Sequence, residues 1–227
     1  WKDMAKAPPI RLISGEIDTS VIQTWSKLDA AARTKFEVSK TPARPQDQKL
    51  WFVQVAQPLT TETRASLQRH LGIELSHYIP ENTYIMSGNS EFPAKAEEHP
   101  AVRWVGLRHP ITKLQQCLQD PQGVLPSEDG TVALYAVLTP KSIFPSRLSA
   151  KELENSWMAE GAPASSISAV SEDKMIAHAS AENARDLALW LGGHSEVDYV
   201  EVKQKMTLRT TGGGHGLRRP VQASQAM

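Results

Sequence analysis

The residues that could carry chemistry in this chain are a single cysteine, seven histidines and a glycine-rich segment near the C-terminus. The segment Gly212–Gly216 has the composition of a phosphate-binding loop, but such a loop needs a strand before it and a helix after it. Arg218, Arg219 and Pro220 follow instead, so we interpret the segment as a flexible tether. The histidines lack metal-ligand spacing, and Cys117 stands in a Gln-rich segment without a catalytic partner. The sequence therefore predicts no catalytic residue, no metal site and no cofactor.

Several aromatic residues lie in segments that read as strands, where they could stack on the bases of RNA. They are Trp51, Phe52, Tyr84, Trp104, Tyr135 and Tyr199. The glycine-aromatic motif of RNA-recognition domains is absent, and 25 basic residues balance 25 acidic ones, so no basic stripe marks a nucleic-acid partner. We expect these side chains to pack in the core and predict no nucleic-acid partner. No apolar run approaches the ~20 residues of a membrane span, and we predict none.

The elements that would position these residues form the same pattern twice. Residues 50 to 107 and residues 131 to 206 each read strand, helix, strand, strand, helix, strand. In both copies the last strand follows a histidine, His99 or His194. This order is the split βαβ, or ferredoxin-like, arrangement. We predict an α+β fold of two tandem ferredoxin-like modules with antiparallel sheets, for which 227 residues with 40% apolar content suffice.

Local signals set the bounds of these elements. The first helix, expected over 60–71, stops at Gly72, and the corresponding helix of the second copy begins with a capping box at Ser149–Glu152 and stops at Gly161. For the first module we further expect strands at 50–55, 73–78, 84–87 and 102–107 and a helix at 94–98. For the second we expect strands at 132–137, 166–170, 175–179 and 197–206 and a helix at 181–191.

Segments outside the repeat complete the predicted organisation. An extra N-terminal helix is expected from Thr19 to about Lys35, because Val21, Trp25 and Leu28 recur on one helical face. Prolines and glycines after residue 109 indicate a linker. The predicted parts are an N-terminal lead-in and helix (1–48), the first module (49–109), the linker (110–130), the second module (131–206) and an extended Gly-rich C-terminal tail (207–227).

Three segments of the first module resemble the N-terminal propeptide of subtilisin-like serine peptidases. The shared elements are Phe52-Val53-Gln54 in the opening strand, the pattern LG…YIP.N.Y from Leu71 to Tyr84, and the pattern V.WVG…P..K from Val102 to Lys113. Precursors of this family can carry a second, related module, which residues 131 to 206 would be. Nothing in the chain resembles the Asp, His or Ser blocks of the catalytic domain.

The resemblance implies a non-enzymatic chain that acts as intramolecular chaperone and inhibitor of the catalytic domain of a subtilisin-like serine peptidase. An exposed sheet face would pack against the peptidase, and the C-terminal tail would lie in the substrate cleft as an added strand. Met227 would then be the cleavage site and fill the main specificity pocket, with Ala226, Gln225 and Ser224 as the next residues along the cleft.

The resemblance also implies that the protein acts in the secretory pathway or outside the cell. Because the chain begins at Trp1 rather than Met, we expect that a targeting signal has been removed. The repeat pattern taken without the resemblance favours an alternative, in which two ferredoxin-like domains form a non-catalytic scaffold or interaction subunit.

Overall fold

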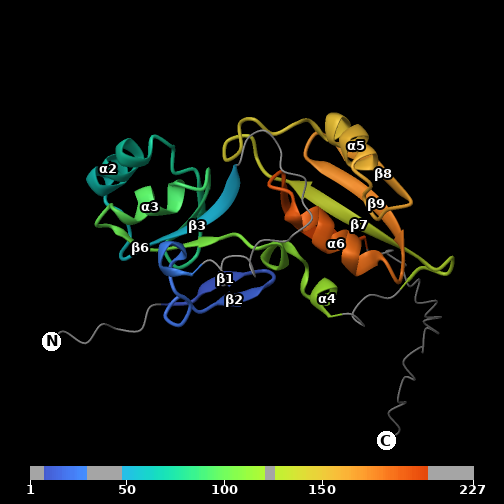
Figure 1. Ribbon diagram of the computed structural model, residues 1–227, viewed down its shortest axis with the longest axis horizontal. Helices are drawn as coiled ribbons and strands as arrows, with labels where there is room; N and C mark the ends of the chain where they lie inside the picture. Colours follow the sequence, from blue (N-terminus) through green and yellow to red (C-terminus); the bar gives the residue numbers. More distant parts are fainter. Residues whose placement is uncertain (1–7, 30–47, 121–125, 204–227) are drawn as a thin grey trace, which may run out of the picture.

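The computed structural model describes residues 8–29, 48–120 and 126–203. It shows a mixed α+β fold built on two four-stranded antiparallel sheets (Figure 1). A small two-stranded sheet formed by the N-terminal residues lies against the first of them. The predicted α+β class and the antiparallel sheets are confirmed.

The first sheet contains the strands β3 (Lys49–Val55), β4 (His77–Ile79), β5 (Thr83–Gly88) and β6 (Val102–Leu107). Their order across the sheet is β4-β5-β3-β6. Helix α2 (Thr61–Leu71) joins β3 to β4, and α3 (Phe92–Glu97) joins β5 to β6. Both helices pack on one face, where Leu67 of α2 and Ala96 of α3 join the same buried cluster as Trp51 of β3.

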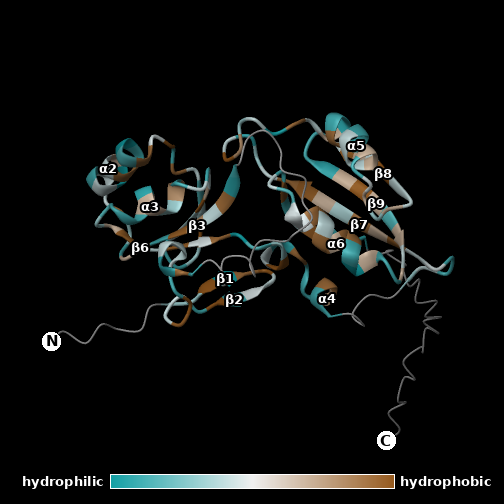
Figure 2. Ribbon diagram, in the orientation of Figure 1, coloured by the Kyte–Doolittle hydropathy of each residue, from teal (hydrophilic) through white to brown (hydrophobic). Residues whose placement is uncertain are grey.

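The second sheet repeats this order of elements. Its strands are β7 (Thr131–Leu138), β8 (Ser166–Ser171), β9 (Lys174–Ser180) and β10 (Val197–Val202), arranged as β10-β7-β9-β8. Helix α5 (Ala150–Ala159) joins β7 to β8, and α6 (Ala184–Gly193) joins β9 to β10. Apolar residues concentrate on β7, β9 and α6, where the second core lies (Figure 2).

The predicted strand at 73–78 is much shorter in the structure. Only His77 and Tyr78 from that span pair with β5, within the three-residue strand β4. Leu75 is buried, and its carbonyl accepts a hydrogen bond from the Arg64 guanidinium of α2. The segment before His77 is thus held against the helix layer, which prevents it from joining the sheet.

The predicted helix from Thr19 to Lys35 is not formed by the described residues. The strands β1 (Ile10–Leu12) and β2 (Gly15–Ile17) form a hairpin, and only the 3-10 turn η1 (Trp25–Lys27) follows. Ser20 donates its backbone N–H to the Asp18 carboxylate (2.9 Å), which closes a local turn where the helix should begin. Val21 is 75% exposed, so it does not share a buried face with Trp25. The remainder of the predicted helix, residues 30–35, lies outside the described residues.

The first part of the predicted linker packs on the second sheet. It contains the 3-10 helix η2 (Pro110–Lys113) and the short helix α4 (Gln116–Gln119). Leu114 and Leu118 are fully buried in the second core, and Leu114 forms a parallel bridge to Val200 of β10. The Gln115 side chain accepts the Val202 N–H at 2.8 Å. The segment therefore closes the outer edge of β10.

The helix termini follow the local signals. Ser149 and Glu152 form the predicted capping box at the start of α5, with the Glu152 carboxylate accepting the Ser149 N–H at 2.8 Å. These hydrogen bonds lower the pKa of Glu152. Gly72 (φ +72°) and Gly161 (φ +78°) follow α2 and α5 in the left-handed conformation that glycine tolerates best.

Replacing Ser149 with Ala is expected to lower the free energy of unfolding by about 1 kcal/mol, because the first turn of α5 loses its cap. Urea denaturation followed by circular dichroism measures the change. Asn155→Ala, at an exposed position of the same helix, is the control and is expected to be neutral or slightly stabilising. Equal changes in the free energy of unfolding for both variants would show that the capping box does not stabilise the fold.

Candidate functional site

The predicted cleft-binding residues Ser224, Gln225, Ala226 and Met227 lie outside the described residues, and so does the segment Gly212–Gly216. Their geometry is therefore not part of the structure, and their role stays a prediction. Within residues 8–29, 48–120 and 126–203, the structure shows the candidate catalytic and metal-binding side chains and the sheet faces that could contact a partner.

Within these ranges the side chains form no metal centre. No group of three or more His, Cys, Asp or Glu residues is arranged to hold an ion. Cys117 is half-buried on α4 and packs against the second core. Among the described helices, none has the length and apolar character needed to cross a bilayer.

His99 and His194 occupy matching turns, each just before the last strand of its sheet. His99 is 7% exposed, and its Nδ1 accepts the Ala101 N–H at 3.3 Å. Burial and the neighbouring His70 lower the pKa of His99, which favours the neutral ring. His194 is 3% exposed, with its ring 4.3 Å from the Trp190 ring. Both side chains thus support the turns that lead into β6 and β10.

The three segments that carry the resemblance meet at one end of the first sheet. Gln54 of β3 lies opposite Thr83 of β5 and opposite Trp104 of β6. The Gln54 amide nitrogen donates to the Glu81 carbonyl at 3.1 Å, in the turn between β4 and β5. Glu81 and Asn82 both have positive φ, so this turn has a specific backbone shape. The resembling residues of the strands therefore lie side by side, whereas Pro110 and Lys113 at the end of the third segment lie in η2, beside the second sheet.

The first sheet is covered on both faces. On the face opposite its helices, Phe52 is fully buried and Ile85 is 4% exposed. Ile10 of the hairpin and Ile143, from the loop after β7, pack on the same cluster. Trp104 lies over Gly106 on this face, and its indole nitrogen donates to a backbone carbonyl of the N-terminal segment.

Polar contacts fix this cover in place. Thr19 donates to the Gln54 Oε1 at 2.7 Å, and the Gln54 amide also donates to the Pro8 carbonyl at 3.1 Å. Ser87 of β5 donates to the Ile143 carbonyl at 2.6 Å. The segments that cover this face thus come from the N-terminal residues and from the loop that connects β7 to α5.

The second sheet has one open face among the described residues. Along β7, residues alternate between buried and half-exposed, with Tyr135 and Val137 on the half-exposed side. Ile176 of β9 lies opposite Tyr135, and Glu201 of β10 lies opposite Tyr135 on its other side. We call the surface formed by Tyr135, Val137, Ser168, Ile176, Tyr199 and Glu201 the open face.

Arg108 joins the two sheets. Its backbone N–H donates to the Leu50 carbonyl of β3 at 2.9 Å, and its guanidinium lies 5.8 Å from the Phe52 ring centroid. The same guanidinium forms an ion pair with the Asp198 carboxylate of β10 and donates to the Asp198 carbonyl at 2.8 Å. The Arg108 side chain is 7% exposed, so this pair is largely removed from water. Ser195 adds a hydrogen bond to the Gln48 carbonyl at 2.8 Å.

Lys113 lies beside this junction and is 2% exposed. Its ammonium group donates to the His194 carbonyl at 2.8 Å. Burial, reinforced by Arg108 and opposed by Asp198 and Glu196, lowers the pKa of Lys113 to about 7. Burial and Lys113 also lower the pKa of His109.

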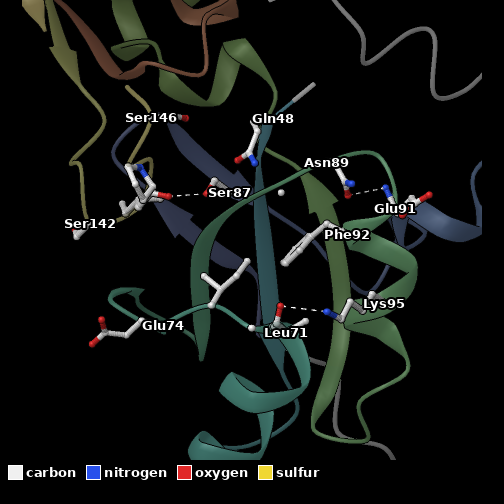
Figure 3. Close-up of a pocket in the computed structure, with 15 residues that line it drawn as sticks. Gln48, Leu71, Glu74, Ser87, Asn89, Glu91, Phe92, Lys95, Ser142 and Ser146 are labelled. Carbon is white, nitrogen blue, oxygen red and sulfur yellow. Dashed lines mark hydrogen bonds between the residues drawn. The ribbon is translucent and has the colours of Figure 1, made fainter. Parts of the chain in front are cut away.

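A pocket of about 820 Å³ lies between the first sheet and the loop at 142–146 (Figure 3). The Phe92 ring points into it, and Ile143 is among the residues that line it. Several of its polar groups already bond to the protein: Lys95 donates to the Leu71 carbonyl at 3.3 Å, and Asn89 accepts the Glu91 N–H at 3.1 Å. The drawn side chains form no nucleophile-and-base pair that would support catalysis.

Sequence reasoning missed the hairpin that covers the first sheet. The signal was present, because Ile10, Leu12 and Ile17 alternate with Arg11 and Glu16 around a Ser-Gly turn. Arg11 and Glu16 also form an exposed ion pair at 3.4 Å. The resemblance implied that one sheet face would be exposed, but the sequence did not show which of the two sheets would have it.

Residues 11–109 match the model of a family described as a domain of unknown function (DUF8729). The match covers less than half of the chain and extends from the hairpin to the end of β6. It places the hairpin and the first sheet in one unit, in agreement with their packing. The comparison with curated proteins gave no match.

Proposed function

We propose that this chain is a propeptide of a subtilisin-like serine peptidase, acting as intramolecular chaperone and inhibitor in the secretory pathway or outside the cell. Its partner is the catalytic domain of the peptidase. The observation that carries the proposal is the resemblance of three segments whose strand residues lie side by side around Gln54.

The architecture supports this proposal. Each sheet has its first and third strands in the centre and its second and fourth strands at the edges, with helices after the first and third strands. All neighbouring strands are antiparallel. We therefore interpret both units as ferredoxin-like modules.

The path of the chain after β10 also favours the proposal. The Lys203 N–H donates to the Ala133 carbonyl at 2.8 Å, which extends the pairing of β10 to the last described residue. The residues that follow include Gly212–Gly216 and the uncharged segment Val221–Met227. In the proposed complex this tail pairs with the cleft of the peptidase as an extended strand, with Met227 in the main specificity pocket.

Inhibition of a bacterial subtilisin, measured with a chromogenic peptide substrate, tests the proposal. The full chain is expected to inhibit, and a form that lacks Val221–Met227 is expected to inhibit at least tenfold more weakly, because it loses the strand in the cleft. Met227→Lys should weaken inhibition, whereas Gln222→Lys is the matched control farther from the pocket.

The possible results separate the parts of the proposal. No inhibition by the full chain at micromolar concentration would overturn the propeptide function. Equal inhibition by the full and shortened chains would overturn the role of the tail. An equal effect of Met227→Lys and Gln222→Lys would overturn the assignment of Met227 to the specificity pocket.

A further inference from the structure

The pocket beside the loop at 142–146 continues along the end of helix α2. It shares residues 72–74 with a second cavity of about 440 Å³, which is also lined by Ala65, Gln68 and Arg69 of α2. We call the two cavities together the groove. We propose that the groove binds an extended peptide segment of a partner protein, in which an apolar side chain stands between basic residues. Peptide binding here adds to the proposed inhibition of a peptidase and does not depend on it.

The apolar part of the groove is already formed. The Phe92 ring points into the larger cavity, and Leu71, Ile73 and Ile143 are among the other residues that line it (Figure 3). A Cβ atom at Gly88 would lie only 2.4 Å from the Phe92 ring, so the glycine allows this ring to pack directly against the end of β5. An apolar side chain of a ligand therefore meets a preformed apolar surface, as is usual for binding pockets.

Hydrogen bonds fix the loop at 142–146, which also lines the larger cavity. Ser87 of the first sheet donates to the Ile143 carbonyl at 2.6 Å. The Arg147 side chain, which is 1% exposed, donates to the Asp173 carboxylate at 2.7 Å, in the turn between β8 and β9. The loop is thus anchored to both sheets. A ligand does not have to order it, which reduces the entropic cost of binding.

Negative charge surrounds the larger cavity. The exposed residues Glu74 and Glu91 lie on opposite sides of it (Figure 3). Lys95 also lines the cavity, but its ammonium group already donates to the Leu71 carbonyl at 3.3 Å. The C-terminal end of α2 adds partial negative charge at the same place. Cationic groups of a ligand therefore complement this part of the groove, whereas the phosphates of a nucleic acid are repelled.

The elongated shape of the groove favours a peptide over a compact ligand. Successive side chains of an extended chain point in opposite directions. An apolar residue that points toward Phe92 therefore directs its two neighbours outward, where Glu74 and Glu91 can pair with basic side chains. Arg69 lies in the smaller cavity and can receive an acidic group farther along the same peptide.

Titration of the isotope-labelled full chain with a blocked peptide, Gly-Lys-Leu-Lys-Gly, followed by nuclear magnetic resonance, tests the proposal. The backbone amide signals of Gly72, Glu74, Asn89 and Phe92 are expected to shift, with a dissociation constant below about 1 mM. The peptide Gly-Glu-Leu-Glu-Gly should bind at least tenfold more weakly, because its charges are reversed. The peptide Gly-Lys-Gly-Lys-Gly should bind at least fivefold more weakly, because it lacks the apolar side chain.

Charge-reversal variants test the same site from the side of the protein. Glu74→Lys combined with Glu91→Lys should weaken binding of Gly-Lys-Leu-Lys-Gly at least tenfold. The matched control combines Glu98→Lys with Glu182→Lys, two exposed positions that do not line the groove. It changes the net charge by the same amount and should weaken binding by less than about twofold, because exposed charges at a distance are screened by salt.

The results that contradict the proposal are specific. It is wrong if the wild-type chain does not bind Gly-Lys-Leu-Lys-Gly at about 1 mM, or if the shifted signals lie outside the groove. Equal affinity for the charge-reversed peptide, or an equal loss in the control variant, also contradicts it. A wild-type chain that binds the peptide at the groove but does not inhibit subtilisin overturns the proposed function alone.

Discussion

Replacing Arg108 with Ala is expected to lower the free energy of unfolding by about 3 kcal/mol, as is usual when one member of a buried ion pair is removed. The change leaves the Asp198 carboxylate without its guanidinium partner and removes the contact with the Phe52 ring. It also removes the donor to the Asp198 carbonyl. Urea denaturation followed by tryptophan fluorescence measures the loss.

Two further variants isolate the contribution of the pair. Arg185→Ala removes an exposed arginine and should change the free energy by no more than about 0.5 kcal/mol. Asp198→Ala combined with Arg108→Ala should cost less than the sum of the single changes, because neither charge is then left alone. If Arg108→Ala has the same small effect as Arg185→Ala, the junction does not stabilise the fold.

Raising the pH from 7 to 9 is expected to stabilise the wild-type chain by about 2 kcal/mol through Lys113. Its folded-state pKa is about 7, well below the ordinary value of 10.5. Between these values the unfolded chain binds more protons than the folded chain, so the free energy of unfolding rises with pH. The gain would level off only above about pH 10, where Tyr84 and Tyr199, whose pKa values are raised by burial, also begin to ionise on unfolding.

Lys113→Met is the test of this pH dependence. The variant keeps the volume of the side chain but cannot ionise, so its stability should no longer rise between pH 7 and pH 9. Lys151→Met, at a lysine whose side chain is 71% exposed, is the control and should keep the wild-type slope. Thermal denaturation at several pH values gives the slopes. A Lys113→Met variant that retains the wild-type slope would assign the effect to another group.

The parts of the fold that the sequence predicted correctly depend on short-range signals. The capping box at Ser149, the glycine after α2 and the apolar run of β3 each act within a few residues, so their effect is visible in one window of sequence. The order of strands and helices was predicted by combining such local signals along the chain.

The errors arose where distant residues decide the local structure. The segment before His77 is held by Arg64 of α2, and the N-terminal region folds as a hairpin against the first sheet. Leu114 and Leu118 stand one helical turn apart, which is an amphipathic signal, but the surrounding prolines and glycines favoured a linker.

The same reason limits the prediction of the site. A strand that alternates between apolar and polar residues shows that one face is buried, but only the three-dimensional arrangement shows what covers the other face. Phe52 and Tyr135 are both aromatic residues at the centre of a strand. Their different exposure depends on Ile10 and Ile143, which lie far from Phe52 in the sequence.

The burial of Ile143 against the first sheet also has a consequence for synthesis on the ribosome. Strand β6, the last strand of that sheet, ends at Leu107. The second face of the sheet is therefore not fully covered until Ile143 has also been synthesised. At ordinary elongation rates this delay lasts roughly 2–7 s. During that interval Phe52 and Ile85 are only partly shielded. The nascent N-terminal half is therefore expected to recruit holding chaperones until translation passes residue 143.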